Sequence, residues 1–207
     1  MSELRVILIG GPPGAGKTTL ARSVAGRLGF LATTVDDLVV TARLVTTKET
    51  HPGLHQVAGS VEYFTRTPPE QLIADATELA AAMWPVVERV IQRHIAAKAP
   101  VVLDWWLFSP EAVSRVAEAS VKSIWLRIDP DALEAREWAN NEFRAESPDP
   151  DLMHENFMQR SYWRNDVVAA QASQLGLPVV HQPGERTVED LTDEVLRYLD
   201  AESSDLG

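Results

Sequence analysis

The chain has 207 residues, of which 45% are hydrophobic and 24% charged, and a formal net charge of −11 at pH 7. These values are typical of a globular protein and disfavour a nucleic-acid partner, which would require a basic surface. The sequence contains no cysteine, which excludes disulfides, thiolate metal sites and a cysteine nucleophile. No apolar run approaches the length of a membrane span, and the chain begins in a strand-like run, so we expect a cytoplasmic protein without a signal peptide.

The first predicted elements are a strand at about residues 4–10, a glycine-rich loop and a helix at 17–28. The loop, residues 11–18, reads GPPGAGKT and matches the phosphate-binding pattern G-x-x-x-x-G-K-[ST]. Its glycines let backbone N–H groups converge on one anion, and the helix N-terminus adds partial positive charge there. The residues expected to hold a triphosphate are Gly11, Pro12, Pro13, Gly14, Ala15, Gly16, Lys17, Thr18 and Thr19.

Two side chains of this loop have distinct expected roles. Lys17 can reach the β- and γ-phosphates, and the Thr18 hydroxyl can bind Mg²⁺. No side chain that reads a particular base stands out, and the chain has no N-K-x-D-type guanine-reading tetrapeptide. We therefore expect ATP and Mg²⁺ as the cofactors.

Apolar strand-like runs continue to alternate with helical patterns along the chain, which predicts an α/β fold with a mainly parallel sheet. The strands are rich in Val, Ile and Leu and largely apolar on both faces, as is typical of strands covered by helices on both sides. Ligands bind such sheets at the carboxyl ends of the strands. The other predicted strands are 31–36, 100–105, 122–128 and 177–181, and the other predicted helices are 37–47, 70–98, 110–119, 130–143, 151–175 and 187–200.

Two less regular stretches interrupt this alternation within what we expect to be one domain, residues 1–207. Residues 47–68 are a candidate substrate loop, and residues 137–165, which include the proline-rich stretch 144–151, are a candidate lid. The alternative is that both are surface connections without a task. Pro85 lies inside the predicted helix 70–98 and should kink it.

Acidic residues close two of the predicted strands. Asp104 follows the apolar residues 101–103 and can hold Mg²⁺, or alternatively cap the next turn. Asp36 and Asp37 end the second predicted strand, where an acid could take the proton from an attacking hydroxyl or hold the metal. One of the pair could instead cap a helix that begins near Leu38. Of the two, we expect Asp37 to carry the chemistry.

Three arginines are candidates for the transfer step. Arg136 lies on the predicted helix 130–143, and Arg160 and Arg164 are one helical turn apart on a later helix, so they share a face. A guanidinium binds phosphate oxygens in a bidentate manner, whereas the alternative is surface ion pairing with neighbouring acids. The turn at 182–185, which contains Gly184, is expected to lie beside the phosphate loop and to cover the adenine base.

The chain resembles the P-loop small-molecule kinases, the group that contains nucleoside monophosphate kinases and shikimate kinase. The motifs are GPPGAGKTT at 11–19 and IDPDALEAR at 128–136, which is similar to the segment leading from strand four to the lid arginine. The resemblance implies a three-layer P-loop NTPase fold with a five-stranded parallel sheet ordered 2-3-1-4-5 and a helical lid. It also implies that Arg136 contacts the ATP phosphates and that Arg160 and Arg164 lie on the helix returning from the lid.

A looser resemblance links the chain to 2-phosphoglycerate-kinase-like sequences. It rests on TVDD at 34–37, VLDWW at 102–106, the long helix 70–98 and FMQRSYW at 157–163. Asp104 and Trp105 stand where that family has a Glu-Gly pair.

The expected function is ATP- and Mg²⁺-dependent transfer of phosphate to a small hydroxylated or acidic metabolite. Two alternatives stay open: a P-loop ATPase or nucleotide switch that acts with a protein partner, and a toxin-like kinase of a sugar nucleotide. We expect a small-molecule acceptor, no nucleic acid and no membrane as partners, and a monomer or homodimer.

Overall fold

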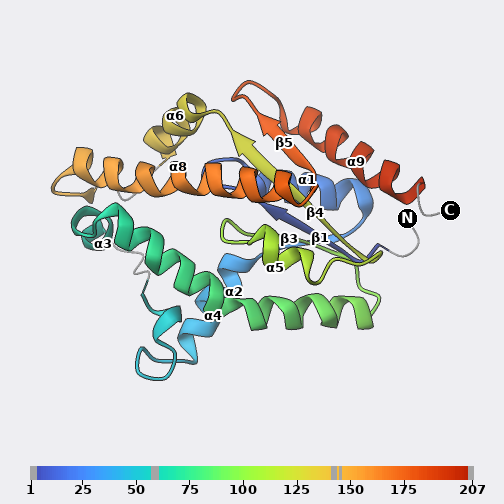
Figure 1. Ribbon diagram of the computed structural model, residues 1–207, viewed down its shortest axis with the longest axis horizontal. Coiled ribbons are helices and arrows are strands. Elements are labelled where there is room, and N and C mark those ends of the chain that lie inside the picture. Colours follow the sequence, from blue (N-terminus) through green and yellow to red (C-terminus); the bar gives the residue numbers. More distant parts are fainter. Residues whose placement is uncertain (1–3, 57–60, 141–143, 145, 205–207) are drawn as a thin grey trace.

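A five-stranded parallel sheet forms the centre of the protein (Figure 1). The computed structural model describes residues 4–56, 61–140, 144 and 146–204. The strands follow the order β2-β3-β1-β4-β5, which confirms the prediction. Their bounds are β1 Val6–Gly10, β2 Leu31–Thr34, β3 Val101–Asp104, β4 Val121–Ile128 and β5 Val179–Gln182.

Helices connect the strands and cover both faces of the sheet, as Figure 1 shows. Each predicted helix has a counterpart in the structure, although α5 is much shorter than the predicted 110–119. The helices are α1 Lys17–Leu28, α2 Val35–Leu44, α3 Val61–Arg66, α4 Pro69–Ala96, α5 Pro110–Ser114, α6 Pro130–Asn140, α8 Pro150–Gln174 and α9 Val188–Ser204, with the 3₁₀ turn η1 at Pro52–Leu54.

Two hydrophobic cores lie on opposite sides of the sheet because successive side chains of a strand point to opposite faces. In β1, Ile7 and Ile9 pack into the core beneath α1 and α9, whereas Val6 and Leu8 pack into the core beneath α4 and α5. All four side chains are fully buried. This three-layer arrangement places the carboxyl ends of all five strands along one edge of the sheet, since all the strands are parallel.

Strand β2 departs from the prediction in two ways. It lies at the edge of the sheet, and Leu31 is 64% exposed, so it is not covered on both faces as expected. It also ends at Thr34, whose hydroxyl accepts a hydrogen bond from the backbone N–H of Asp36 at 3.3 Å and caps α2. Asp36 and Asp37 therefore lie in the first turn of α2, not at a strand end, and neither of them is the N-cap.

The two irregular stretches are more ordered than their composition indicates. The candidate substrate loop 47–68 contains η1 and α3, and residues 57–60 lie outside the described part. In the candidate lid 137–165, the described residues belong mainly to α6 and α8, while 141–143 and 145 lie outside the description. Helix α4 contains Pro85 and changes direction partway along its length (Figure 1), as a proline that removes a backbone hydrogen bond requires. None of the helices within the described ranges is long and apolar enough to span a bilayer.

Candidate phosphoryl-transfer site

The loop between β1 and α1 has the backbone shape of an anion nest. Gly14 and Gly16 have φ angles of 70° and 88°, in the left-handed region that favours glycine. A Cβ at Gly14 would also come within 2.4 Å of Glu137 Oε1, so a side chain there would displace the Glu137 carboxylate in addition to straining the backbone. Gly16 is the N-cap of α1 and, among the described residues, no side chain caps this helix. The first N–H groups of α1 therefore remain available to an anion.

Lys17 is charged but only 8% exposed. Its Nζ donates a hydrogen bond to the carbonyl oxygen of Pro12 at 2.6 Å. Burial lowers the pKa of Lys17 to about 8, and the negative charges of Asp104 and Asp36 partly offset that effect. The ammonium of Lys17 is thus held inside the loop, in a position to bind a phosphate oxygen.

Thr18 and Asp104 meet at the edge of the sheet, as the sequence motif predicts. Thr18 Oγ1 donates a hydrogen bond to Asp104 Oδ2 at 2.7 Å. Burial raises the pKa of Asp104, and the hydrogen bond from Thr18 and the charge of Lys17 oppose this shift. With Asp37, the two side chains line a small cavity of about 110 Å³, to whose wall Arg22 also contributes a positive charge. A hydroxyl beside two carboxylates is the oxygen donor set that Mg²⁺ prefers, so the residues fit the metal.

Asp36 and Asp37 have different surroundings although they are neighbours in the chain. Asp36 Oδ1 accepts a hydrogen bond from the indole Nε1 of Trp105 at 3.1 Å. Loss of water around this carboxyl raises its pKa, whereas Lys17 and the Trp105 hydrogen bond lower it. Asp37 instead lines the small cavity together with Thr18 and Asp104. The structure thus gives different surroundings to the two acids, of which the sequence led us to expect Asp37, rather than Asp36, to carry the chemistry.

Arg160 lies in an aromatic enclosure. Its Cζ is 4.6 Å from the ring centre of Trp106, 4.6 Å from that of Phe157 and 5.1 Å from that of Phe64. The residue is 3% exposed, and burial lowers its pKa to about 10. Among the described residues Arg160 has no ion pair, and its Nε has no hydrogen-bond partner. A guanidinium surrounded by rings rather than carboxylates keeps its charge available for an anionic ligand.

The other two predicted arginines bind backbone carbonyls. Arg164 Nε donates to Trp106 O at 2.6 Å, and its Nη2 donates to Phe108 O, so this side chain holds the turn after β3. Burial lowers the pKa of Arg164 to about 9. Arg136 donates to Gly14 O and to Gly184 O, each at 3.2 Å, and thereby joins the phosphate loop to the turn after β5. The structure therefore places Arg136 and Gly184 beside the loop.

Sequence reasoning missed two contributors to the site. Glu137 is 9% exposed and packs against Gly14, and burial raises its pKa. Glu137 lies one helical turn after Leu133, and both side chains are next to Gly14. This four-residue spacing could have indicated that Glu137 shares the face of α6 that packs on the loop. The second is Trp105, which packs in the core, 1% exposed, and whose indole N–H donates a hydrogen bond to Asp36.

Helix α3, which lies in the candidate substrate loop, is hydrogen-bonded directly to residues of the candidate lid. Asn156 of α8 donates to the carbonyl oxygens of Phe64 and Thr65, both at 3.3 Å. The Thr65 and Ser147 hydroxyls are hydrogen-bonded at 2.8 Å. Because Phe64 also contacts Arg160, these bonds connect the position of α3 to the aromatic enclosure.

Comparison with known proteins agrees with this architecture. The shikimate kinase from Acinetobacter baumannii in complex with shikimate superposes with a TM-score of 0.63 at 16% identity, covering 97% of this chain and 96% of that one. A gluconokinase from Sinorhizobium meliloti 1021 gives 0.55 at 14% identity, with 99% and 95% covered, and the shikimate kinase from Aquifex aeolicus gives 0.55 at 14%, with 97% and 98% covered. At these low sequence identities, the superpositions show that the folds are similar and nothing further. None of the curated proteins compared with the chain matches it.

The family comparison covers most of the chain. Residues 6–162 match the model of the AAA_33 family, described as an AAA domain, and this range contains the phosphate loop, Asp36, Asp104 and Arg160. Its fold is that of the P-loop small-molecule kinases. The chain belongs to the AAA_33 family.

Proposed function

We propose that the protein is an ATP- and Mg²⁺-dependent kinase that phosphorylates a hydroxyl group of a small hydroxylated or acidic metabolite in the cytoplasm. The observation that carries this proposal is the 2.7 Å hydrogen bond between Thr18 and Asp104, beside the buried ammonium of Lys17. This arrangement places two oxygen atoms of the kind that bind Mg²⁺ next to a phosphate-binding loop at one edge of the sheet. Asp36 and Arg160 supply the further groups that transfer to an acceptor requires.

The residues of the loop bind and orient the donor. The backbone N–H groups of residues 14–18, which follow the two prolines, hold the phosphate chain, and Lys17 stabilises the negative charge that develops on the β–γ bridge. When bound by Thr18 and Asp104, Mg²⁺ would neutralise charge on the β- and γ-phosphates. Arg136, already bonded to Gly14 and Gly184, keeps the loop and the adenine-side turn in a fixed relation.

The acceptor side rests on Asp36 and Arg160. The acceptor oxygen forms a bond to the γ-phosphorus while the bond to the β–γ bridging oxygen breaks, and ADP leaves. Asp36 takes the proton of the attacking hydroxyl, and its raised pKa makes it a better base than an ordinary aspartate. Arg160 binds an anionic group of the acceptor or the moving phosphoryl group, and Arg164 positions the turn that carries Trp106. Asp37 acts on the metal side.

The first experiment measures ADP production from ATP and Mg²⁺ with separate pools of polyols, hydroxy acids, sugar phosphates and sugar nucleotides. A pool that raises turnover well above basal hydrolysis supports the kinase and identifies the acceptor class. Stimulation only by sugar nucleotides would favour the toxin-like kinase. Hydrolysis that no pool stimulates would contradict the proposal and favour an ATPase or switch with a protein partner.

Three variants test the assigned roles in that assay. Lys17→Ala should abolish transfer and leave the fold intact. Asp36→Asn should lower kcat by about 100-fold or more with little change in the Kd for MgATP, because it removes the base and not the donor site. Asp37→Asn, the matched control, should mainly raise the Mg²⁺ concentration needed for half-maximal rate. The reverse pattern in the two aspartate variants would exchange their roles.

A further inference from the structure

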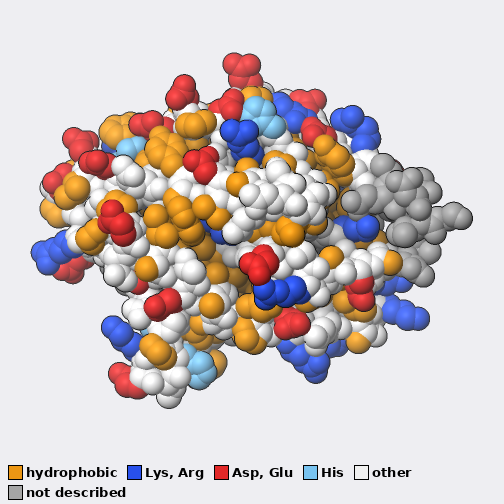
Figure 2. Space-filling model, viewed as in Figure 1, with side chains coloured by type: hydrophobic (Ala, Val, Ile, Leu, Met, Phe, Trp, Pro, Cys, Tyr) orange, Lys and Arg blue, Asp and Glu red, His pale blue; other side chains and the backbone are white. Residues whose placement is uncertain are grey.

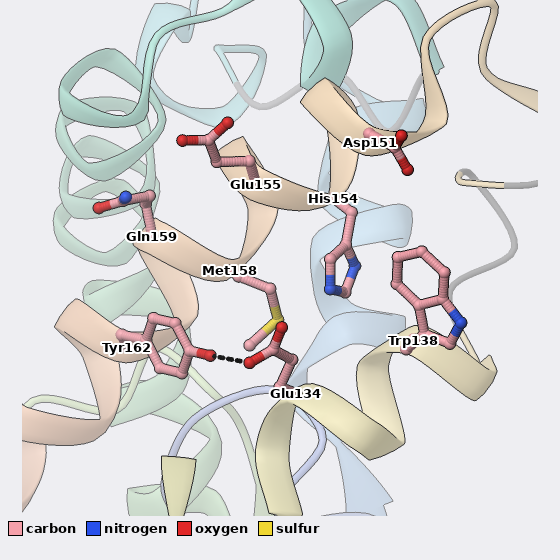
Figure 3. Close-up of a pocket in the computed structure, with 8 residues that line it drawn as sticks. All are labelled: Glu134, Trp138, Asp151, His154, Glu155, Met158, Gln159 and Tyr162. Carbon is pink, nitrogen blue, oxygen red and sulfur yellow. Dashed lines mark hydrogen bonds between the residues drawn. The ribbon is translucent and has the colours of Figure 1, made fainter. Parts of the chain in front are cut away.

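Helices α6 and α8 line a second cavity, of about 360 Å³, on a different face of α6 from the one that contacts the phosphate loop. Leu133, Arg136 and Glu137 of α6 contact the loop. Glu134 and Trp138, which lie one turn apart on another face of the same helix, line the cavity. Figure 3 shows these two side chains turned toward His154, Met158 and Tyr162 of α8. No residue of this cavity has a role in the proposed transfer reaction.

The walls combine negative charge with aromatic surface. Glu134, Asp151 and Glu155 supply three carboxylates, and neither lysine nor arginine lines the cavity in the described part of the chain. One guanidinium lies close by, that of Arg144, whose Cζ is 3.9 Å from the ring centre of Trp138. The carboxylates outnumber it three to one. Figure 2 shows the same balance at the surface, where acidic side chains surround hydrophobic ones over α6 and α8.

His154 gives the independent sign that this cavity is built for a ligand. The residue is 6% exposed, yet neither ring nitrogen has a hydrogen-bond partner among the described residues. Buried polar groups are normally satisfied, because an unpaired donor or acceptor costs about 1–3 kcal/mol. Its ring packs edge to face on Trp138, with centroids 4.8 Å apart, and the imidazole lines the cavity between that ring and Met158.

We propose that the α6–α8 cavity binds an organic cation, specifically a protonated amine carried on a flat apolar body. The carboxylates of Glu134 and Asp151 attract the ammonium. The His154 nitrogens are buried in the cavity wall, and on a small rotation of the neutral ring one of them accepts a hydrogen bond from the ligand. Trp138, which is 45% exposed, and Tyr162 offer ring surface to the apolar body. The Tyr162 hydroxyl already donates to Glu134 Oε2 at 2.9 Å and so fixes that carboxylate at the wall.

The test compares phenethylamine with phenethyl alcohol, which has the same body without the charge. Binding is followed by the side-chain NMR signals of Trp138 and His154 during titration of the full chain, with no nucleotide present. Phenethylamine should shift both signals in a saturable manner, and the alcohol should bind about tenfold more weakly or less. This comparison uses the wild-type protein, so it does not depend on the folding of any variant.

Two double variants locate the charge that matters. Glu134→Gln with Asp151→Asn should weaken amine binding by on the order of tenfold, whereas Glu70→Gln with Glu78→Gln, which removes two charges from α4, should leave it unchanged. Equal binding of the alcohol and the amine would overturn the proposal. So would equal weakening by both double variants, absence of saturation, or a preference for spermidine that leaves the Trp138 signal unmoved. Kinase activity is not read, so the result stands apart from the proposed function.

Discussion

Lys17 shows how one buried charge links pH to binding. A phosphate needs the ammonium form, but in the free protein the pKa of Lys17 is about 8. Affinity for MgATP should therefore fall by up to about tenfold per pH unit above about pH 8, because binding then requires uptake of a proton. Calorimetric titration between pH 7 and 9.5 measures this. Lys17→Ala should bind weakly, without that dependence. A flat wild-type profile would show that Lys17 does not titrate there.

The same lysine has a predictable effect on stability. Its ordinary pKa is 10.5, so between about pH 8 and 10.5 the unfolded chain binds more protons at this position than the folded chain. The free energy of unfolding therefore rises with pH across this window, and the full cost of burying the charge applies below it. Binding of a nucleotide offsets that cost, which is consistent with a residue kept for function rather than stability.

At the level of single residues, sequence spacing located the donor side better than the acceptor side. The motif fixed the loop, and a polar residue after a buried strand put Asp104 near Thr18, because parallel strands end at the same edge. The enclosure of Arg160 is different, since its rings come from Phe64, Trp106 and Phe157 on three separate segments. A pattern within one segment of the sequence cannot predict that side chains from three distant segments contact the same residue. The separation of Asp36 from Asp37 likewise depends on where α2 begins.

At the level of elements, alternation of strand and helix patterns was enough to predict an α/β fold with a parallel sheet covered on both faces, and the sheet order followed from the resemblance to the P-loop small-molecule kinases. It failed where a local contact overrides composition. The Thr34 cap starts α2 two residues earlier than the predicted start, and the polar stretch 47–68 forms α3 because α8 supplies partners for its backbone. The exposed surface of β2 follows from its place at the sheet edge, which an apolar count does not reveal.

Two asparagines of α8 allow a matched test of the contact between α3 and α8. Asn156 donates to two carbonyls of α3, whereas Asn165 binds the N–H and carbonyl of Ile128, both at 3.0 Å. Each alanine variant should lose about 1–3 kcal/mol of unfolding free energy, because each leaves two buried backbone groups unpaired. Only Asn156→Ala should speed hydrogen exchange in residues 61–66. Equal exchange in both variants would show that Asn156 does not hold α3.

For the whole molecule, ligand binding should be visible as stability. MgATP at 100 times its Kd stabilises the folded state by about 2.7 kcal/mol, which raises the Tm of a chain of this size by about 5–10 °C. Thermal unfolding with and without MgATP measures the shift, and Lys17→Ala should lose most of it. Duplex DNA should give no shift, since the net charge is −11. A Tm that MgATP leaves unchanged would contradict nucleotide binding itself.

Helix α6 contacts two separate sites, the phosphate loop on one face and the α6–α8 cavity on another. If binding at one of these sites affects binding at the other, the effect must be reciprocal. If an occupant of one side changes affinity on the other by a given factor, the second ligand changes the affinity of the first by that same factor. The eleven residues of α6 are therefore the part of the chain through which a compound bound at the α6–α8 cavity would change the affinity of the phosphate loop for its own ligand.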